Sequence, residues 1–189
     1  MPQAAPMSDS IHTQFRHFLA IPDNAPLGPE PRSNRLTLSD LNGKLDTLFK
    51  TAKLSPASQQ LVRSLVLLWH DHLDASHEIS QSIENADGSL VHAIMHRREP
   101  DYWNSKYWWR RVGNHPAFPA IASRVEQLLR SNGDMALQKK LLTGGKWDPF
   151  VFVDECEAAA ASGSTERIKQ LQEIQRVETE AVLEYFLTQ

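Results

Sequence analysis

The sequence predicts an all-α fold, a single-domain helical bundle of six to eight helices with an irregular, proline-rich N-terminal arm. Apolar residues recur at helical spacing along most of the chain, and no run alternates between apolar and polar residues as a strand would. A chain of 189 residues with 41% apolar and 23% charged residues has the size and composition of one globular core. We expect residues 1–35 to form the arm and residues 36–189 to form the domain.

The arm contains six of the eleven prolines within its first 31 residues. Proline removes a backbone donor and restricts the residue before it, so the arm cannot be regular throughout. We expect at most a short helix over residues 11–20. The first core helix follows Ser39, which suits the N-cap position, and its apolar side comprises Leu41, Leu45, Leu48 and Phe49.

The next element predicted is the longest helix, over residues 56–84. Ser55 suits the N-cap, Pro56 suits the first helical position, and Asn85-Ala86-Asp87-Gly88 ends the helix. A shorter helix over residues 89–98 stops before Pro100. We expect these two helices to be antiparallel neighbours because the turn between them is short.

Three further helices are predicted, over residues 119–131, 150–161 and 164–187, with turns at residues 113–116 and 143–145. The last helix has charges on one side and apolar residues on the other. This pattern fits either a packing strut or a homodimer contact. The apolar side comprises Ile168, Leu171, Ile174, Val177 and Ala181.

Charge and composition exclude several classes of protein. A net charge of -3 provides no global attraction to nucleic acid or to an anionic membrane, so we expect neither partner. No apolar run approaches the roughly 18 residues of a membrane span, and the first ten residues lack the order of a secretion signal. Cys156 is the single cysteine, which excludes an internal disulfide and fits a reducing compartment. We expect a cytoplasmic protein.

One segment has the residue types of a metal site. Between Ser64 and His96 there is no lysine or arginine, but there are five of the eight histidines and five carboxylates. Imidazole and carboxylate groups bind divalent ions, and no ammonium group competes here. His92 and His96 are four residues apart on one helical face, where His77 or Glu84 of the preceding helix could meet them.

We therefore expect His77, His92 and His96 to bind a divalent ion of the zinc, manganese or nickel class, with Glu84 as a further ligand or general base. The alternative is that these histidines only satisfy helix packing, since two histidines four residues apart are common by chance. We expect His72 to donate a hydrogen bond to a neighbouring carbonyl or carboxylate group. His70, Asp71 and Asp74 are expected on a solvated face.

The following stretch, residues 97–111, combines large aromatic rings with five cations. Arginine binds phosphate or carboxylate groups, and aromatic rings stack on bases or sugars. The alternative is that the rings fill the core while the arginines pair with carboxylates. Candidate cations that neutralise developing charge are Arg98, Arg110 and Arg111; candidate ligand-binding residues are Trp103, Tyr107, Trp108 and, in the next turn, His115.

The run His-Ala-Ile-Met-His-Arg-Arg-Glu-Pro-Asp-Tyr over residues 92–102 continues in the motifs Lys106-Tyr107-Trp108 and Arg110-Arg111-Val112-Gly113 and in His115-Pro116. It resembles the signature of a family of uncharacterised soluble proteins. The resemblance covers roughly residues 60–155 and includes the segments 68–72 and 147–150. That family has no established activity, so the resemblance implies no mechanism.

Two classes of function remain open at this point. The first is metal-assisted hydrolysis of a phosphorylated or carboxylated small molecule, with metal, cations and rings in one cleft. The second is a non-enzymatic ligand-binding or structural protein that uses residues 97–111.

Overall fold

The computed structural model describes residues 10–189 and confirms the all-α fold. The described part of the chain contains ten α-helices, which exceeds the expected six to eight. The expected longest helix is divided in two, and helices also form over residues 102–112 and 135–141. The elements are α1 Ile11–Arg16, η1 His17–Leu19, α2 Leu38–Phe49, α3 Pro56–Trp69, α4 Leu73–Gln81, α5 Ala86–Arg98, α6 Tyr102–Val112, α7 Phe118–Ser131, α8 Met135–Leu141, β1 Leu142–Thr143, β2 Lys146–Trp147, α9 Pro149–Ser162 and α10 Thr165–Phe186.

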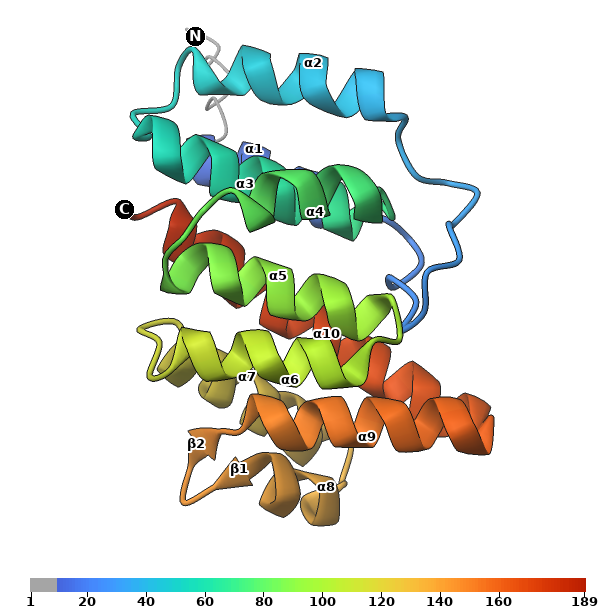
Figure 1. Cartoon of the computed structure of the whole chain (residues 1–189). Coiled ribbons are helices and arrows are strands. Elements are labelled where there is room, and N and C mark those ends of the chain that lie inside the picture. Colours follow the sequence, from blue (N-terminus) through green and yellow to red (C-terminus); the bar gives the residue numbers. More distant parts are fainter. Residues whose placement is uncertain (1–9) are drawn as a thin grey trace, which may run out of the picture.

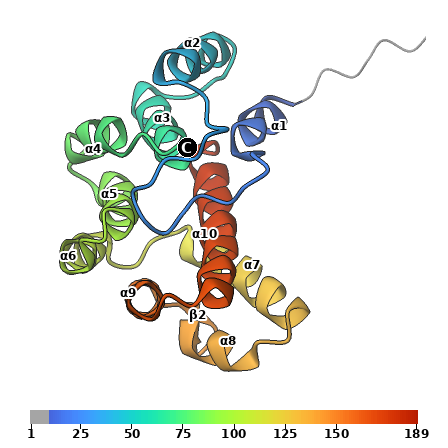
Figure 2. The same cartoon turned by 90° about the vertical axis from the view of Figure 1, so that its right-hand side faces the viewer.

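The helices from α2 to α6 lie side by side, and each reverses the direction of the one before it (Figure 1). Helix α10 lies in the middle of the molecule and contacts α1, α3, α7 and α9 (Figure 2). The strands β1 and β2, of two residues each, form an antiparallel hairpin before α9, in which Leu142 pairs with Trp147. No helix within residues 10–189 is both long and apolar enough to cross a membrane.

The apolar side predicted for the last helix is packed inside the chain. Leu171, Ile174 and Ala181 of α10 are almost completely buried against the helices around it. Glu178 on the same helix is buried too, and its Oε1 accepts a hydrogen bond from Nη1 of Arg97 on α5 at 3.2 Å. Helix α10 is therefore the central packing strut of the bundle, and the homodimer contact stays a prediction.

The described part of the N-terminal arm packs onto the body. Phe15 and Phe18 are buried in the core, and no helix or strand forms from residue 20 to residue 37. The side chains of Arg98 and Gln175 donate hydrogen bonds to the Pro26 carbonyl group, which attaches the irregular segment to α5 and α10. Pro2 and Pro6, which belong to the proline-rich pattern, lie outside the described residues.

The prediction of one helix over residues 56–84 is wrong. Helix α3 ends at Trp69, α4 begins at Leu73, and Asp71 between them has a φ of 63°. Aspartate enters this left-handed region more readily than most residues. The Asp71 carboxylate accepts hydrogen bonds from the guanidinium groups of Arg32 at 2.9 Å and Arg98 at 2.8 Å. Long-range ion pairs thus hold a break that no glycine or proline marks in the sequence.

This break also corrects the expected exposure of its residues. His70 and Asp71 are 2% and 5% exposed instead of lying on a solvated face, whereas Asp74 is exposed as expected. His70 accepts a hydrogen bond from the Leu36 amide at Nδ1, so its Nε2 hydrogen points to the Phe18 carbonyl oxygen. His72 donates from Nε2 to the Leu36 carbonyl oxygen, the structural role expected of it.

Candidate metal centre

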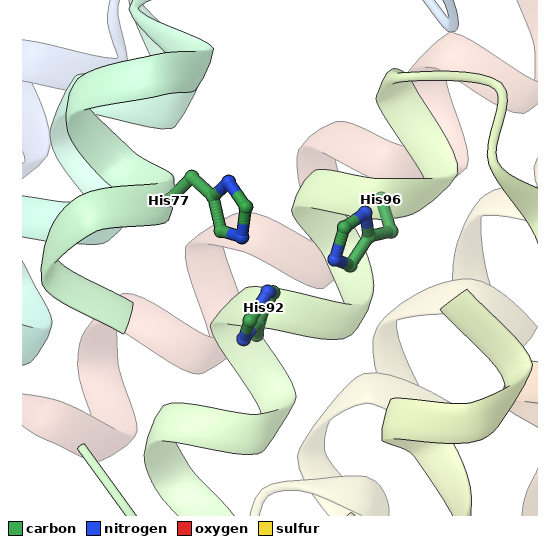
Figure 3. Close-up of side chains that lie close together, drawn as sticks. All are labelled: His77, His92 and His96. Carbon is green, nitrogen blue, oxygen red and sulfur yellow. The ribbon is translucent and has the colours of Figure 1, made fainter. Parts of the chain in front are cut away.

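Three histidines converge between α4 and α5. One ring nitrogen of each of His77, His92 and His96 lies within 4.8 Å of the other two. The ring centroids are 4.6 Å apart for His77 and His92, 4.6 Å for His92 and His96, and 5.2 Å for His77 and His96. Figure 3 shows the three rings facing one shared space. The three histidines of these two helices therefore lie close together, as the sequence predicts.

The local sequence explains how α4 and α5 come together. His92 and His96 are four residues apart and lie on one face of α5, whereas His77 comes from α4. Asn85 caps α5 by accepting a hydrogen bond from the Gly88 amide at 2.9 Å. A Cβ atom at Gly88 would lie 2.1 Å from the Ile83 carbonyl oxygen. Glycine at this position therefore permits the close packing of the connecting loop on the start of α5.

His92 is the most enclosed of the three. Its side chain is buried, and neither ring nitrogen has a hydrogen-bond partner within the described part of the chain. The Trp108 ring stacks on it with centroids 3.9 Å apart and an interplanar angle of 21°, which fixes the plane of the imidazole. Burial and the neighbouring His96 and His77 lower the pKa of His92 to about 3. The ring is thus neutral and keeps a lone pair.

His96 has partners at both nitrogens. Nδ1 lies 2.9 Å from the Glu99 carboxylate, and Nε2 lies 3.1 Å from the Asn104 amide nitrogen. A hydrogen on Nδ1 that is donated to Glu99 leaves a lone pair on Nε2, which accepts from the Asn104 amide, so an ion would displace this hydrogen bond. Burial lowers the pKa of His96, and the charge of Glu99 opposes this effect in part. Histidine ligands of metals commonly have a carboxylate on the opposite nitrogen, and Glu99 occupies that position.

The donor set fits a divalent ion after a small closure of the rings. Two nitrogens bound at about 2.0–2.1 Å in a tetrahedral site are roughly 3.3 Å apart. The nitrogens here are separated by up to 4.8 Å, so an ion would require the rings to approach by about 1 Å or somewhat more. His77 is only half-buried, and α4 has an exposed outer face that leaves room for this movement.

Two residues expected in the centre lie elsewhere. Glu84 is exposed in the loop after α4 and does not belong to the converging group, because α4 ends at Gln81 and the helical register no longer applies. Arg98 is buried on another side of α5, where it binds Asp71 and the Leu68 carbonyl group. Both expectations are corrected: neither residue supplies a base or a cation to the three histidines.

The remaining candidate cations and His115 are dispersed as well. The Arg111 guanidinium group lies 5.1 Å from the centroid of the Trp108 ring, which stacks on His92. Arg110 instead lines a separate cavity near the end of α6. His115 is buried, and its Nε2 donates to Asp87 at 2.8 Å while Nδ1 accepts from the Ala117 amide. His115 therefore connects the turn before α7 to the start of α5 and does not belong to the group of three converging histidines.

The aromatic residues of α6 form a row that leads away from His92. Trp108 packs on His92, Tyr107 meets Trp108 edge-on, and Trp103 stacks on Tyr107 with centroids 6.4 Å apart. Trp103 is 74% exposed and Tyr107 is 40% exposed. The alternative that all rings fill the core thus holds for Trp109, which is 1% exposed, but not for these two.

Sequence reasoning missed the contacts of Glu99 and Asn104 with His96. The position of Glu99, three residues after His96, is a usable indication, because residue i+3 lies next to residue i on a helix. Asn104 reaches His96 only because α5 and α6 are packed antiparallel, which the sequence analysis did not predict. Comparison of the chain with models of protein families, with curated proteins and with solved structures found no match. The resemblance to a family of uncharacterised soluble proteins stays a prediction.

Proposed function

We propose that this chain is a metal-binding protein in which His77, His92 and His96 hold one divalent ion. The observation that carries the proposal is His92, a buried imidazole with two unpartnered nitrogens beside two other imidazoles. Most buried polar side-chain atoms in folded proteins have a partner, and an isolated one costs free energy. An ion shared by the three rings would be the partner of one of these two nitrogens.

The ligand types favour zinc within the zinc, manganese and nickel class. Manganese prefers carboxylate, carbonyl and water oxygens, whereas imidazole suits zinc and nickel. Three histidines with one further position open are a ligand set found in catalytic zinc sites. Glu99 holds the tautomer of His96, and Trp108 holds the ring plane of His92, so two of the three ligands are already oriented.

The enzymatic form of the proposal is metal-assisted hydrolysis of a phosphorylated or carboxylated small molecule. An ion with an open position acts as a Lewis acid toward water or a substrate oxygen. In this chain His77 forms the solvent-facing side of the centre, and the Arg111 guanidinium group lies over Trp108, which stacks on His92. Of the three predicted cations, Arg111 is the candidate for neutralising an anionic substrate.

A second candidate is a non-enzymatic ligand-binding protein, and the exposure of Trp103 and Tyr107 favours it. Two exposed, nearly parallel rings with an interplanar angle of 13° offer a stacking surface for a planar ligand. This surface is continuous with Trp108 and therefore with the three histidines. The two candidates differ in whether the ion takes part in a reaction.

The test uses protein purified without an affinity tag and freed of metal with EDTA. Titration calorimetry with zinc is expected to give one ion per chain. His77→Ala, His92→Ala and His96→Ala are each expected to weaken zinc binding by about 100-fold, because each removes a ligand. His17→Ala is the matched control, since His17 is exposed and lies outside the converging group. Circular dichroism checks that every variant keeps its helices.

Zinc affinity that is unchanged in all three ligand variants, or lowered equally in the control, would exclude the site. Hydrolysis of 4-nitrophenyl phosphate and 4-nitrophenyl acetate then separates the two candidates. Turnover that needs zinc and disappears in His92→Ala supports the enzyme. Zinc binding without turnover, together with a lower affinity for a planar ligand in Trp103→Ala, supports the binding protein.

A further inference from the structure

A cavity of about 1,100 Å³ lies among the end of α6, the start of α7, the hairpin and the start of α9. None of the three histidines of the metal centre lines it, so it is a second, independent feature of the molecule. Its wall includes three prolines and four large aromatic side chains. The aromatic side chains are Trp109, Phe118, Trp147 and Phe150.

Two polar atoms in this wall have no partner. Trp109 is 1% exposed and Trp147 is 4% exposed, and the Nε1–H groups of both are buried without an acceptor among residues 10–189. Indole nitrogen can only donate a hydrogen bond. These two donors come from different elements, α6 and β2, whose aromatic rings both line the cavity.

The charges around the cavity favour an anion. Arg110 and Lys146 line it, and neither side chain makes an ion pair within the described part of the chain. The nearby acid is Asp148, whose carboxylate already accepts the Phe150 and Val151 amides and caps α9. Helix α7 starts at the cavity without a side-chain cap. The partial positive charge of its N-terminus therefore adds to the positive charge of Arg110 and Lys146.

We propose that this cavity binds a small aromatic carboxylate. The ring of such a ligand lies among Trp109, Phe118 and Phe150, and its carboxylate accepts from Arg110 and Lys146 at the rim. A pocket of mostly apolar lining with a few convergent polar groups is the usual form of a small-molecule site. The inference does not depend on the proposed metal centre.

The test is calorimetric titration of the full chain with naphthalene-2-carboxylate and with uncharged 2-naphthalenemethanol, which has the same ring. We expect the acid to bind more tightly than the alcohol. The double variant Arg110→Gln, Lys146→Gln is expected to weaken binding of the acid about tenfold and to leave the alcohol unchanged, because two partly exposed charges are removed. The matched control is Arg130→Gln, Lys139→Gln, which removes the same charge elsewhere.

Ala122→Phe provides a second measurement, because Ala122 lines the cavity and a larger side chain fills it. This variant is expected to abolish binding of both probes. Equal affinity for acid and alcohol, equal weakening in the control double variant, or no binding of the acid up to about 1 mM would each overturn the proposal. Because the charge variants change only exposed side chains, they decide the question even if Ala122→Phe does not fold.

Discussion

Replacement of His92 by phenylalanine is expected to raise the free energy of unfolding of the metal-free protein. With zinc present, the variant is expected to be less stable than wild type. The neutral imidazole buries one donor and one acceptor without partners. An unsatisfied buried polar group costs about 1–3 kcal/mol. Phenylalanine removes both groups and keeps a ring against Trp108, while its larger size costs about 1 kcal/mol or more. The two unsatisfied groups together outweigh the cost of the larger ring, so the net gain without metal is about 1 kcal/mol or more.

Zinc is expected to reverse this order. An ion that binds only the folded state adds about 2.7 kcal/mol to the free energy of unfolding when its concentration is 100 times Kd. His92→Phe lacks a ligand and gains far less from zinc. Urea unfolding of both proteins, measured in EDTA and in excess zinc, tests the crossing. We expect the variant to be more stable in EDTA and less stable in zinc.

His96→Phe is the matched control, because its nitrogens have partners in Glu99 and Asn104. Its replacement leaves those partners unpaired and is expected to cost about 1 kcal/mol in EDTA, opposite in sign to the change at His92. If His92→Phe destabilises the metal-free protein as His96→Phe does, the reasoning from unpartnered nitrogens is refuted. If zinc stabilises all three proteins equally, the metal centre is refuted.

Three further predictions address the support of the site and of the fold. Glu99→Gln is expected to weaken zinc binding roughly tenfold in calorimetry, because the carboxylate that orients His96 is lost. Gly88→Ala is expected to lower the free energy of unfolding by about 2 kcal/mol or more in urea, because the new Cβ meets the Ile83 carbonyl group. Asp71→Asn is expected to cost about 3 kcal/mol near neutral pH, since it leaves buried arginines without their counter-charge. Burial would raise the pKa of Asp71, but Arg32 and Arg98 outweigh burial and hold that pKa below its ordinary value. The stability that Asp71 confers is therefore present above about pH 4 and is lost as the pH falls through its folded-state pKa. The difference in free energy of unfolding between wild type and Asp71→Asn is therefore expected to become smaller in acid.

Helical spacing was enough to predict the parts of the fold that depend on amphipathic faces. Helices α2, α7, α9 and α10 begin and end within a few residues of their predicted bounds, because caps and apolar stripes are local features. The break between α3 and α4 was not predictable in this way. It depends on Asp71 and on two arginines that lie 39 and 27 residues away in the chain.

The convergence of His77 with His92 and His96 was predicted although the helix assumed for His77 was wrong. What the prediction needed was a short connection between two helices and a histidine on the facing side of each, and both hold for α4 and α5. The prediction for Glu84 was wrong because it assumed that the helical register continues beyond Gln81. The prediction for Arg98 was wrong because sequence alone does not identify the carboxylate that an arginine contacts in the folded chain.

Helix α5 explains why the histidine cluster is a stronger indication in the structure than in the sequence. The helix is buried from Gly88 to Arg98, so its polar side chains require partners on every side. Arg97 meets Glu178, Arg98 meets Asp71, and His96 meets Glu99. The contact of Arg97 with Glu178 joins α5 to α10, and the hydrogen bond of Arg98 to the Leu68 carbonyl group joins α5 to α3. His92 is left as the buried imidazole on this helix with no partner for either nitrogen among the described residues, at the point where two more imidazoles converge.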